Sequence, residues 1–315
     1  NITGDAVFEA GDTGVLIRAD GGSINLNGSN TYDVKNNSVF AYALGADGIK
    51  VNFSGANQTL NLSGGSIGFV YDGDSSNIQQ DTLYNYLNQN FVGLNNLNVN
   101  VLDDARLFVL NNYGTLKLSE LENLDTGVGL FGSVSGNGGN TLLNKGTLVL
   151  DGTGTINLDD PDDFYSNTDK AATGITVESG VTITGTQEGQ VALGGKDTYR
   201  GNPGENTYVI MNNNGTINIS GDKSVGIYTN NGIINNNSNI SVTGKSSAGL
   251  FGENSSVVTN SGNIAIADNG VGIYAVSYQN PAEPDVGYGN GLVDGTNNGI
   301  ITANASEKAT GIYVN

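Results

Sequence analysis

The sequence predicts an all-β protein: a right-handed parallel β-helix, in which short strands stack in successive coils. Three observations predict this fold class, namely a recurring Gly-apolar-aromatic triplet, an alternating strand in front of each triplet, and a composition unsuited to helices. The triplets are Gly226-Ile227-Tyr228, Gly249-Leu250-Phe251, Gly272-Ile273-Tyr274 and Gly311-Ile312-Tyr313.

The triplet glycines recur at a fixed distance. Gly226, Gly249 and Gly272 lie 23 residues apart, and Gly311 follows Gly272 by 39. Such a period is typical of solenoid proteins, whose units fold only by stacking on their neighbours. With insertions allowed for, the whole chain has room for roughly 11–13 coils of this length. We expect residues 1–315 to form a single β-helix segment with loop insertions.

The residues in front of each triplet have the pattern of a half-buried strand. Apolar and polar residues alternate in Thr216-Ile217-Asn218-Ile219, which places them on opposite faces. The isoleucines at equivalent positions of successive repeats are Ile217, Ile240, Ile264 and Ile301. Helical repeats are disfavoured because Asn, Gly, Ser and Thr, which dominate these units, are poor in helix interiors.

Composition excludes several classes of function. The chain has no cysteine and no histidine, which excludes disulfides, a Ser-His-Asp triad and a His-ligated zinc site. Its net charge of −19 disfavours binding to nucleic acid and to anionic lipid. No apolar run approaches the roughly 20 residues of a spanning helix, so we expect no membrane insertion by this segment. Because no signal peptide opens the chain, we expect an excised piece of a larger protein.

Residues 75–92 interrupt the strand pattern. Three apolar residues there follow the spacing of a short amphipathic helix: Leu83, Leu87 and Phe91. We expect a helical insertion that covers a flank of the coils. The alternative is a protruding binding element that displays Tyr84 and Tyr86.

An acidic run occupies residues 159–163, which read DDPDD. Four carboxylates in five residues could bind Ca²⁺. The Gly-x-Asp spacing of known calcium loops is missing, however, and a charge run is usually a solvated loop. We therefore expect no metal site and no cofactor, and leave the calcium alternative open.

The repeats resemble a known family. Over residues 212–315, repeats of the form N-x-G-x-I-x-I are followed by Gly-Ile-Tyr-like triplets. This arrangement is similar to the passenger domains of monomeric, type V secreted autotransporter adhesins of Gram-negative bacteria. The resemblance implies a right-handed parallel β-helix displayed at the cell surface. It also implies anchoring in the bacterial outer membrane through a C-terminal barrel that is not present in this chain.

Function is expected to be adhesive rather than enzymatic. A rigid β-helical rod would display loops that attach to a receptor, either glycan or protein, on host cells or other bacteria, and we expect a monomer. One alternative is a polysaccharide lyase or glycosidase built on a β-helix, which needs a fixed carboxylate pair or a basic residue in a groove. Another is a structural protein similar to a phage tailspike, which would be trimeric.

The candidate binding site lies in the longest spacing of the repeat. Residues 277–295 contain two of the chain's 4 prolines, and proline cannot donate to a strand ladder, so this segment should project as a loop. Its aromatic and polar side chains are suited to sugar or basic-peptide contacts. The candidate ligand-binding residues are Tyr278, Asn280, Glu283, Asp285, Tyr288 and Asn290.

Overall fold

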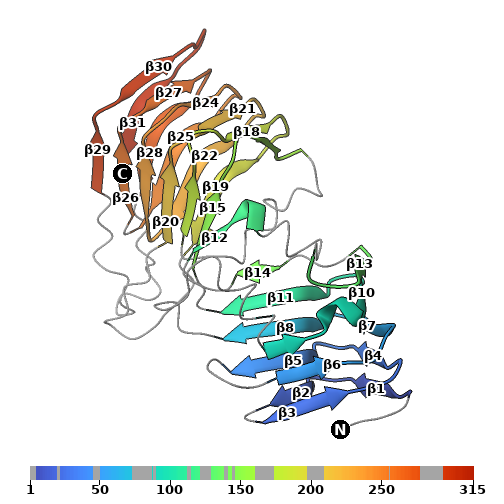
Figure 1. Cartoon of the computed structure of the whole chain (residues 1–315). Helices are drawn as coiled ribbons and strands as arrows, with labels where there is room; N and C mark the ends of the chain where they lie inside the picture. The colour runs from blue at the N-terminus through green and yellow to red at the C-terminus, as the bar shows by residue number, and fades with distance from the viewer. Residues whose placement is uncertain are drawn as a thin grey trace. The chain divides into compact units, whose positions relative to one another are not determined.

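The computed structural model shows an all-β chain with parallel sheets (Figure 1). It describes residues 5–19, 22–44, 50–72, 87, 90–111, 115–120, 129–137, 141–143, 146–159, 174–196, 209–254, 256–276 and 294–315. The chain divides into two compact units, Asn1–Gly146 and Thr147–Asn315, and each is described by itself.

The first unit is built from short strands, with a 3-10 helix at Leu94–Asn96. The strands are β1 (Val7–Ala10), β2 (Val15–Ala19), β3 (Ser23–Leu26), β4 (Thr31–Val34), β5 (Val39–Leu44), β6 (Lys50–Phe53), β7 (Gln58–Leu62), β8 (Ile67–Asp72), β9 (Phe91–Val92), β10 (Leu97–Val101), β11 (Arg106–Asn111), β12 (Thr115–Lys117), β13 (Ser133–Ser135) and β14 (Leu142–Leu143). Residues 118–120, directly after β12, are helical.

The second unit contains the clear sequence repeats. Its strands are β15 (Thr147–Leu150), β16 (Thr155–Asn157), β17 (Gly174–Val177), β18 (Thr182–Gly185), β19 (Val191–Lys196), β20 (Val209–Asn213), β21 (Thr216–Ile219), β22 (Val225–Asn230), β23 (Gly232–Asn236), β24 (Ile240–Val242), β25 (Ala248–Glu253), β26 (Val257–Asn260), β27 (Asn263–Ile266), β28 (Val271–Val276), β29 (Asp294–Asn297), β30 (Ile300–Ala303) and β31 (Thr310–Val314).

Strands that follow one another in sequence belong to different sheets. In the first unit the sheet orders are β1-β4-β7-β10-β13, β2-β5-β8-β11-β14 and β3-β6-β9. In the second unit the strand orders within the three sheets are β15-β17-β20-β23-β26-β29, β16-β18-β21-β24-β27-β30 and β19-β22-β25-β28-β31 (Figure 1). The chain thus returns to the same sheet after visiting the others, which is compatible with the β-helix expected from the sequence.

The repeat isoleucines align as the sequence predicts. Ile217 pairs with Ile240, Ile240 with Ile264, and Ile264 with Ile301, all in parallel register. Ile217, Ile240 and Ile264 are buried, so one residue type forms a continuous apolar column through successive strands. The predicted equivalence of the repeats is therefore confirmed over this part of the chain.

The core of the first unit contains a cluster of aromatic rings among its aliphatic side chains. Phe69 contacts Phe40, Phe91, Phe108 and Phe131, with ring centroids 5.1–5.7 Å apart. Such ring pairs add about 0.5–1.5 kcal/mol each beyond the burial of their surface. Large side chains from different strands therefore fill an interior that the second unit fills with isoleucine, leucine and valine.

One buried polar cluster accompanies these rings. The hydroxyl of Tyr32 donates to Oε1 of Gln58 at 2.6 Å, and both side chains are fully buried. Burial raises the pKa of Tyr32 to about 12. The phenol is therefore a neutral hydrogen-bond donor throughout the physiological pH range.

The helical insertion expected at residues 75–92 is only partly covered by the described residues. Leu87 and Asn90 are helical, but Phe91 and Val92 form β9, which pairs in parallel with Val51 and Asn52 of β6. The assignment of Phe91 to the helical stripe was therefore wrong. Its ring packs edge-on against Phe69 at 5.1 Å, and aromatic and β-branched residues such as Phe and Val suit a strand.

The triplet glycines are required by close packing. A Cβ atom on Gly249 would lie 2.5 Å from Cγ2 of Ile264 and 2.7 Å from the carbonyl oxygen of Gly272. The equivalent atom on Gly226 would lie 2.8 Å from Cγ2 of Ile240. In the first three triplets the glycine thus lets the strand approach the isoleucine column of the adjoining sheet, whereas nothing lies within 4 Å of a Cβ added to Gly311.

We predict that Gly249→Ala destabilises the protein by about 1–3 kcal/mol, because the added methyl group overpacks the interior. Gly154→Ala is the matched control, since nothing lies within 4 Å of its added Cβ. Urea unfolding of both variants measures the difference. Equal stability of the two variants would contradict the packing explanation.

An amide ladder runs through the interior of the second unit. Nδ2 of Asn213 donates to Oδ1 of Asn236 at 2.8 Å, Asn236 donates to Asn260 at 2.7 Å, and Asn260 donates to Asn297 at 2.7 Å. The ladder starts at Asn213, whose Oδ1 is buried without a hydrogen-bond partner. The residue paired with Asn213 on the preceding strand is Val177, which offers no donor.

We predict that Val177→Thr is better tolerated than the same change at Val242. Both valines are fully buried, and a buried hydroxyl without a partner costs about 1–3 kcal/mol. At position 177 the new hydroxyl can donate to Oδ1 of Asn213. At position 242 the paired residues are Ile219 and Ile266, which offer no side-chain acceptor. Thermal unfolding that ranks Val242→Thr as the more stable variant would refute this.

Candidate functional site

Residues 277–293 of the predicted binding loop lie outside the described residues, whereas its last two residues, Asp294 and Gly295, belong to β29 and pair with β26, so the prediction placed the end of the loop two residues too late. All of its candidate ligand-binding residues fall outside the described residues: Tyr278, Asn280, Glu283, Asp285, Tyr288 and Asn290. The structure describes its flanks, where β28 ends at Val276 and β29 begins at Asp294. Of the acidic run at 159–163, it describes only Asp159.

An aromatic stripe crosses the sheet that contains β28, the strand that leads to this loop. It consists of Tyr228 (β22), Phe251 (β25), Tyr274 (β28) and Tyr313 (β31), which are paired in register. Successive ring centroids are 5.3, 4.8 and 5.0 Å apart. The aromatic residues of the four sequence triplets therefore line up along one side of the sheet.

The stripe is on the solvent side of its sheet. Tyr228, Phe251 and Tyr274 are half-buried and Tyr313 is exposed, whereas the neighbouring Ile227 is fully buried. At its other end the stripe begins next to Gly194, which pairs with Tyr228 and carries no side chain. Aromatic surface of this extent, open to solvent, is able to contact a ligand.

A carboxylate is held beside the stripe. The hydroxyl of Tyr228 donates to Oε2 of Glu253 at 2.7 Å, and Nδ2 of Asn230 donates to the same oxygen at 3.1 Å. Nδ2 of Asn254 in turn donates to Oδ1 of Asn230 at 2.7 Å. Rings next to an oriented acceptor can bind the apolar face and a hydroxyl group of a sugar, or a cation.

Sequence reasoning missed Glu253 and Asn230. A signal was present, because both follow the triplet aromatic residue by two positions, as in Tyr228-Thr229-Asn230 and Phe251-Gly252-Glu253. In a strand, residues two apart lie on the same face. The polar partners of the stripe could therefore have been named from the repeat alone.

The stripe and the predicted loop are adjacent in the chain. Tyr274 is two residues before Val276, the last residue of β28, and the chain then enters residues 277–293. The last described residues before the segment that the sequence singled out therefore lie on the strand that carries Tyr274 of the stripe.

Carboxylates in the turns connect adjacent strands. Asp159, after β16, accepts hydrogen bonds from the backbone N–H groups of Thr186 and Gln187 and from Nε2 of Gln190 at 3.0, 3.3 and 2.8 Å. The bonds from Thr186, followed by the one from Gln190, lower the pKa of Asp159 to about 2. These donors come from the turn after β18, the strand next to β16 in its sheet. The hydrogen bonds therefore connect the turns that follow two adjacent strands.

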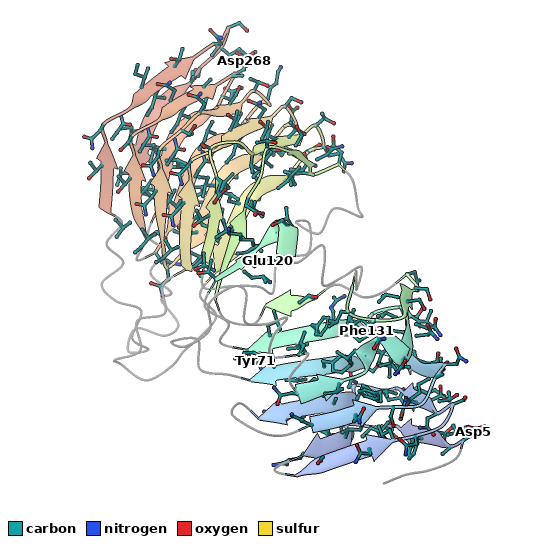
Figure 2. The ribbon with its side chains drawn as sticks, viewed as in Figure 1. Asp5, Tyr71, Glu120, Phe131 and Asp268 are labelled. Atoms are coloured by element: carbon teal, nitrogen blue, oxygen red, sulfur yellow. The ribbon has the colours of Figure 1, made fainter. Side chains whose placement is uncertain are left out.

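Other turn carboxylates of the second unit accept hydrogen bonds from a neighbouring turn in the same way. Asp268, labelled in Figure 2, accepts from the backbone N–H groups of Glu307 and Ser306 at 3.1 and 2.6 Å. These bonds lower the pKa of Asp268 below its ordinary value. Asp222 accepts from the N–H of Lys245 at 2.8 Å. Within the described residues, no group of three or more acidic side chains is placed to hold a metal ion.

We predict that Asp159→Asn lowers the melting temperature near neutral pH but hardly at all near pH 2. A carboxylate whose folded-state pKa is depressed stabilises the fold above its ordinary pKa of 3.8. That contribution disappears as the pH falls through the folded value of about 2. Calorimetry across this pH range measures the effect, with Glu178→Gln, at an exposed turn, as control. A pH-independent difference would exclude a role for the charge.

No family model, curated protein or solved structure significantly matches the sequence. None of the helical segments that the structure describes has the length and apolar character needed to cross a membrane.

Proposed function

We propose that the chain is a right-handed parallel β-helix segment from the passenger of a Gram-negative autotransporter adhesin. Support for the β-helix comes from strands that return to the same sheets in parallel, with matching residue types in register over four successive repeats. Support for the family comes from the sequence pattern of residues 212–315. On this proposal the segment is displayed at the cell surface, anchored in the outer membrane by a part of the protein outside this sequence.

The proposed activity is attachment to a glycan or protein receptor on a host cell or another bacterium. The observation that carries it is the solvent-facing aromatic stripe, with Glu253 held beside Tyr228, at the origin of residues 277–293. Aromatic surface and oriented polar groups together suit carbohydrate or peptide contacts. Because the strands are fixed by their neighbours, the stripe and the start of the loop form a stable base for recognition.

We predict that replacing residues 279–290 with a short Gly-Ser linker reduces attachment of the protein to cells while leaving its melting temperature nearly unchanged. Surface loops tolerate changes in length at little cost in stability, whereas the receptor contacts would be lost. Flow cytometry with labelled protein measures attachment, and calorimetry measures stability.

A matched control is the same linker in place of residues 197–207, a second polar segment between strands of this unit. It should leave attachment intact. Tyr274→Ala separates packing from binding. If the ring is purely structural, its removal should lower the melting temperature and leave attachment intact. If attachment survives removal of residues 279–290, the loop is not the recognition element.

A further inference from the structure

We propose that Glu253 and the aromatic stripe beside it form a binding site for a lysine side chain on a basic protein. The inference rests on the proposed function, because it names the receptor group that this same surface takes. Of the two receptor classes named there, glycan and protein, it selects protein. The residues concerned are Glu253, Tyr228, Asn230 and Phe251, all of them half-buried.

Glu253 is a carboxylate whose charge is not balanced by a neighbour. Its hydrogen bonds come from the neutral groups of Tyr228 and Asn230, which orient the side chain without cancelling its charge. In the part of the chain that the structure describes, no lysine or arginine forms an ion pair with it. The net charge of −19 adds a field that attracts cations and repels anions. A positively charged ligand group is therefore favoured over a neutral or acidic one.

The rings next to the carboxylate favour a long side chain with a charged end. Phe251 precedes Glu253 by two residues on β25, so both side chains project from the same face of the sheet. The Phe251 ring lies between Tyr228 and Tyr274, with centroids 5.3 and 4.8 Å away. The apolar stem of a lysine can lie along such rings while its ammonium group reaches the carboxylate. An amino sugar carries its ammonium group directly on the sugar ring and has no such stem, so lysine fits better.

The hydrogen bonds of Glu253 favour lysine over arginine. Oε2 already accepts from Tyr228 at 2.7 Å and from Asn230 at 3.1 Å, which occupies both of its lone pairs. No donor among the described residues reaches Oε1, so a ligand finds one open oxygen. A guanidinium gains most when it bonds to both oxygens of a carboxylate, whereas an ammonium is a point charge that needs only one. The carboxylate is therefore prepared for an ammonium group.

Surface plasmon resonance with immobilised hexalysine tests the proposal at physiological ionic strength. Glu253→Gln keeps the shape of the side chain and removes its charge, so affinity for hexalysine should fall about threefold or more. Glu178→Gln is the matched control, because it removes the same unit of charge from an exposed turn. The control should bind hexalysine nearly as tightly as the unmodified protein. With hexa-arginine as the probe, the loss caused by Glu253→Gln should be smaller.

Tyr228→Phe tests the selection of lysine over arginine. The ring is retained, but Oε2 of Glu253 loses one of its two donors and becomes open to a ligand. Affinity for hexa-arginine should therefore rise relative to affinity for hexalysine. A hydroxyl group with a purely structural role would change stability and leave this ratio unaltered. Circular dichroism verifies that each variant is folded at the temperature of the binding measurement.

The proposal is overturned if Glu253→Gln and Glu178→Gln bind hexalysine equally, or if Tyr228→Phe leaves the ratio of the two affinities unchanged. It is also overturned if a glucosamine hexamer loses more affinity than hexalysine in Glu253→Gln, which would assign the site to an amino sugar. Flow cytometry of the unmodified protein on cells keeps the two proposals apart. Attachment to cells without a hexalysine effect removes only the lysine site, whereas absence of attachment contradicts the proposed function whatever hexalysine shows.

Discussion

The structure depends on parallel strands being held in one register from each layer to the next. Side chains alternate between the two faces of a strand, so a slip of one residue would move an inner column such as Ile217 and Ile240 to the solvent side. Several kinds of side chain prevent this together. Isoleucines stack on isoleucines, rings on rings, and amides on amides, and each match exists only in the observed alignment. The turn carboxylates fix the same alignment from outside the strands.

Sequence alone could predict the middle of the second unit because the repeats that contain Gly226, Gly249 and Gly272 have the same length and the same chemistry. The 23-residue spacing marked which residues are equivalent, and the isoleucine and aromatic columns followed from it. The first unit gave a weaker signal for a physical reason. There Asn61 bonds to Asp33 across 28 residues and Asn100 to Asn61 across 39, so layer length changes while the strands still stack.

Core chemistry accounts for the error at Phe91. In the first unit phenylalanines from several strands pack around Phe69, so a phenylalanine there can be buried from a strand. A phenylalanine at helical spacing is then ambiguous between a helix stripe and a short strand. For the candidate site the limit was different. The sequence located the loop by its prolines and length, and the position of Glu253 two residues after Phe251 placed its side chain on the face of the stripe, but the hydrogen bonds from Tyr228 and Asn230 to one oxygen of Glu253 join residues of two strands and came from the structure.

The amide ladders have a directional property that bears on how long such a stack can grow. From Asn213, each amide donates toward the later strand, as in Asn213 to Asn236. From the adjacent Asn212, donation runs toward the earlier strand, since Asn235 donates to Asn212 and Asn212 to Thr176. Side-chain dipoles in the two ladders therefore point in opposite directions and largely cancel. An α-helix accumulates partial charge at its ends because its peptide dipoles align; in these two neighbouring ladders, each added layer brings further hydrogen bonds while the side-chain dipoles oppose one another.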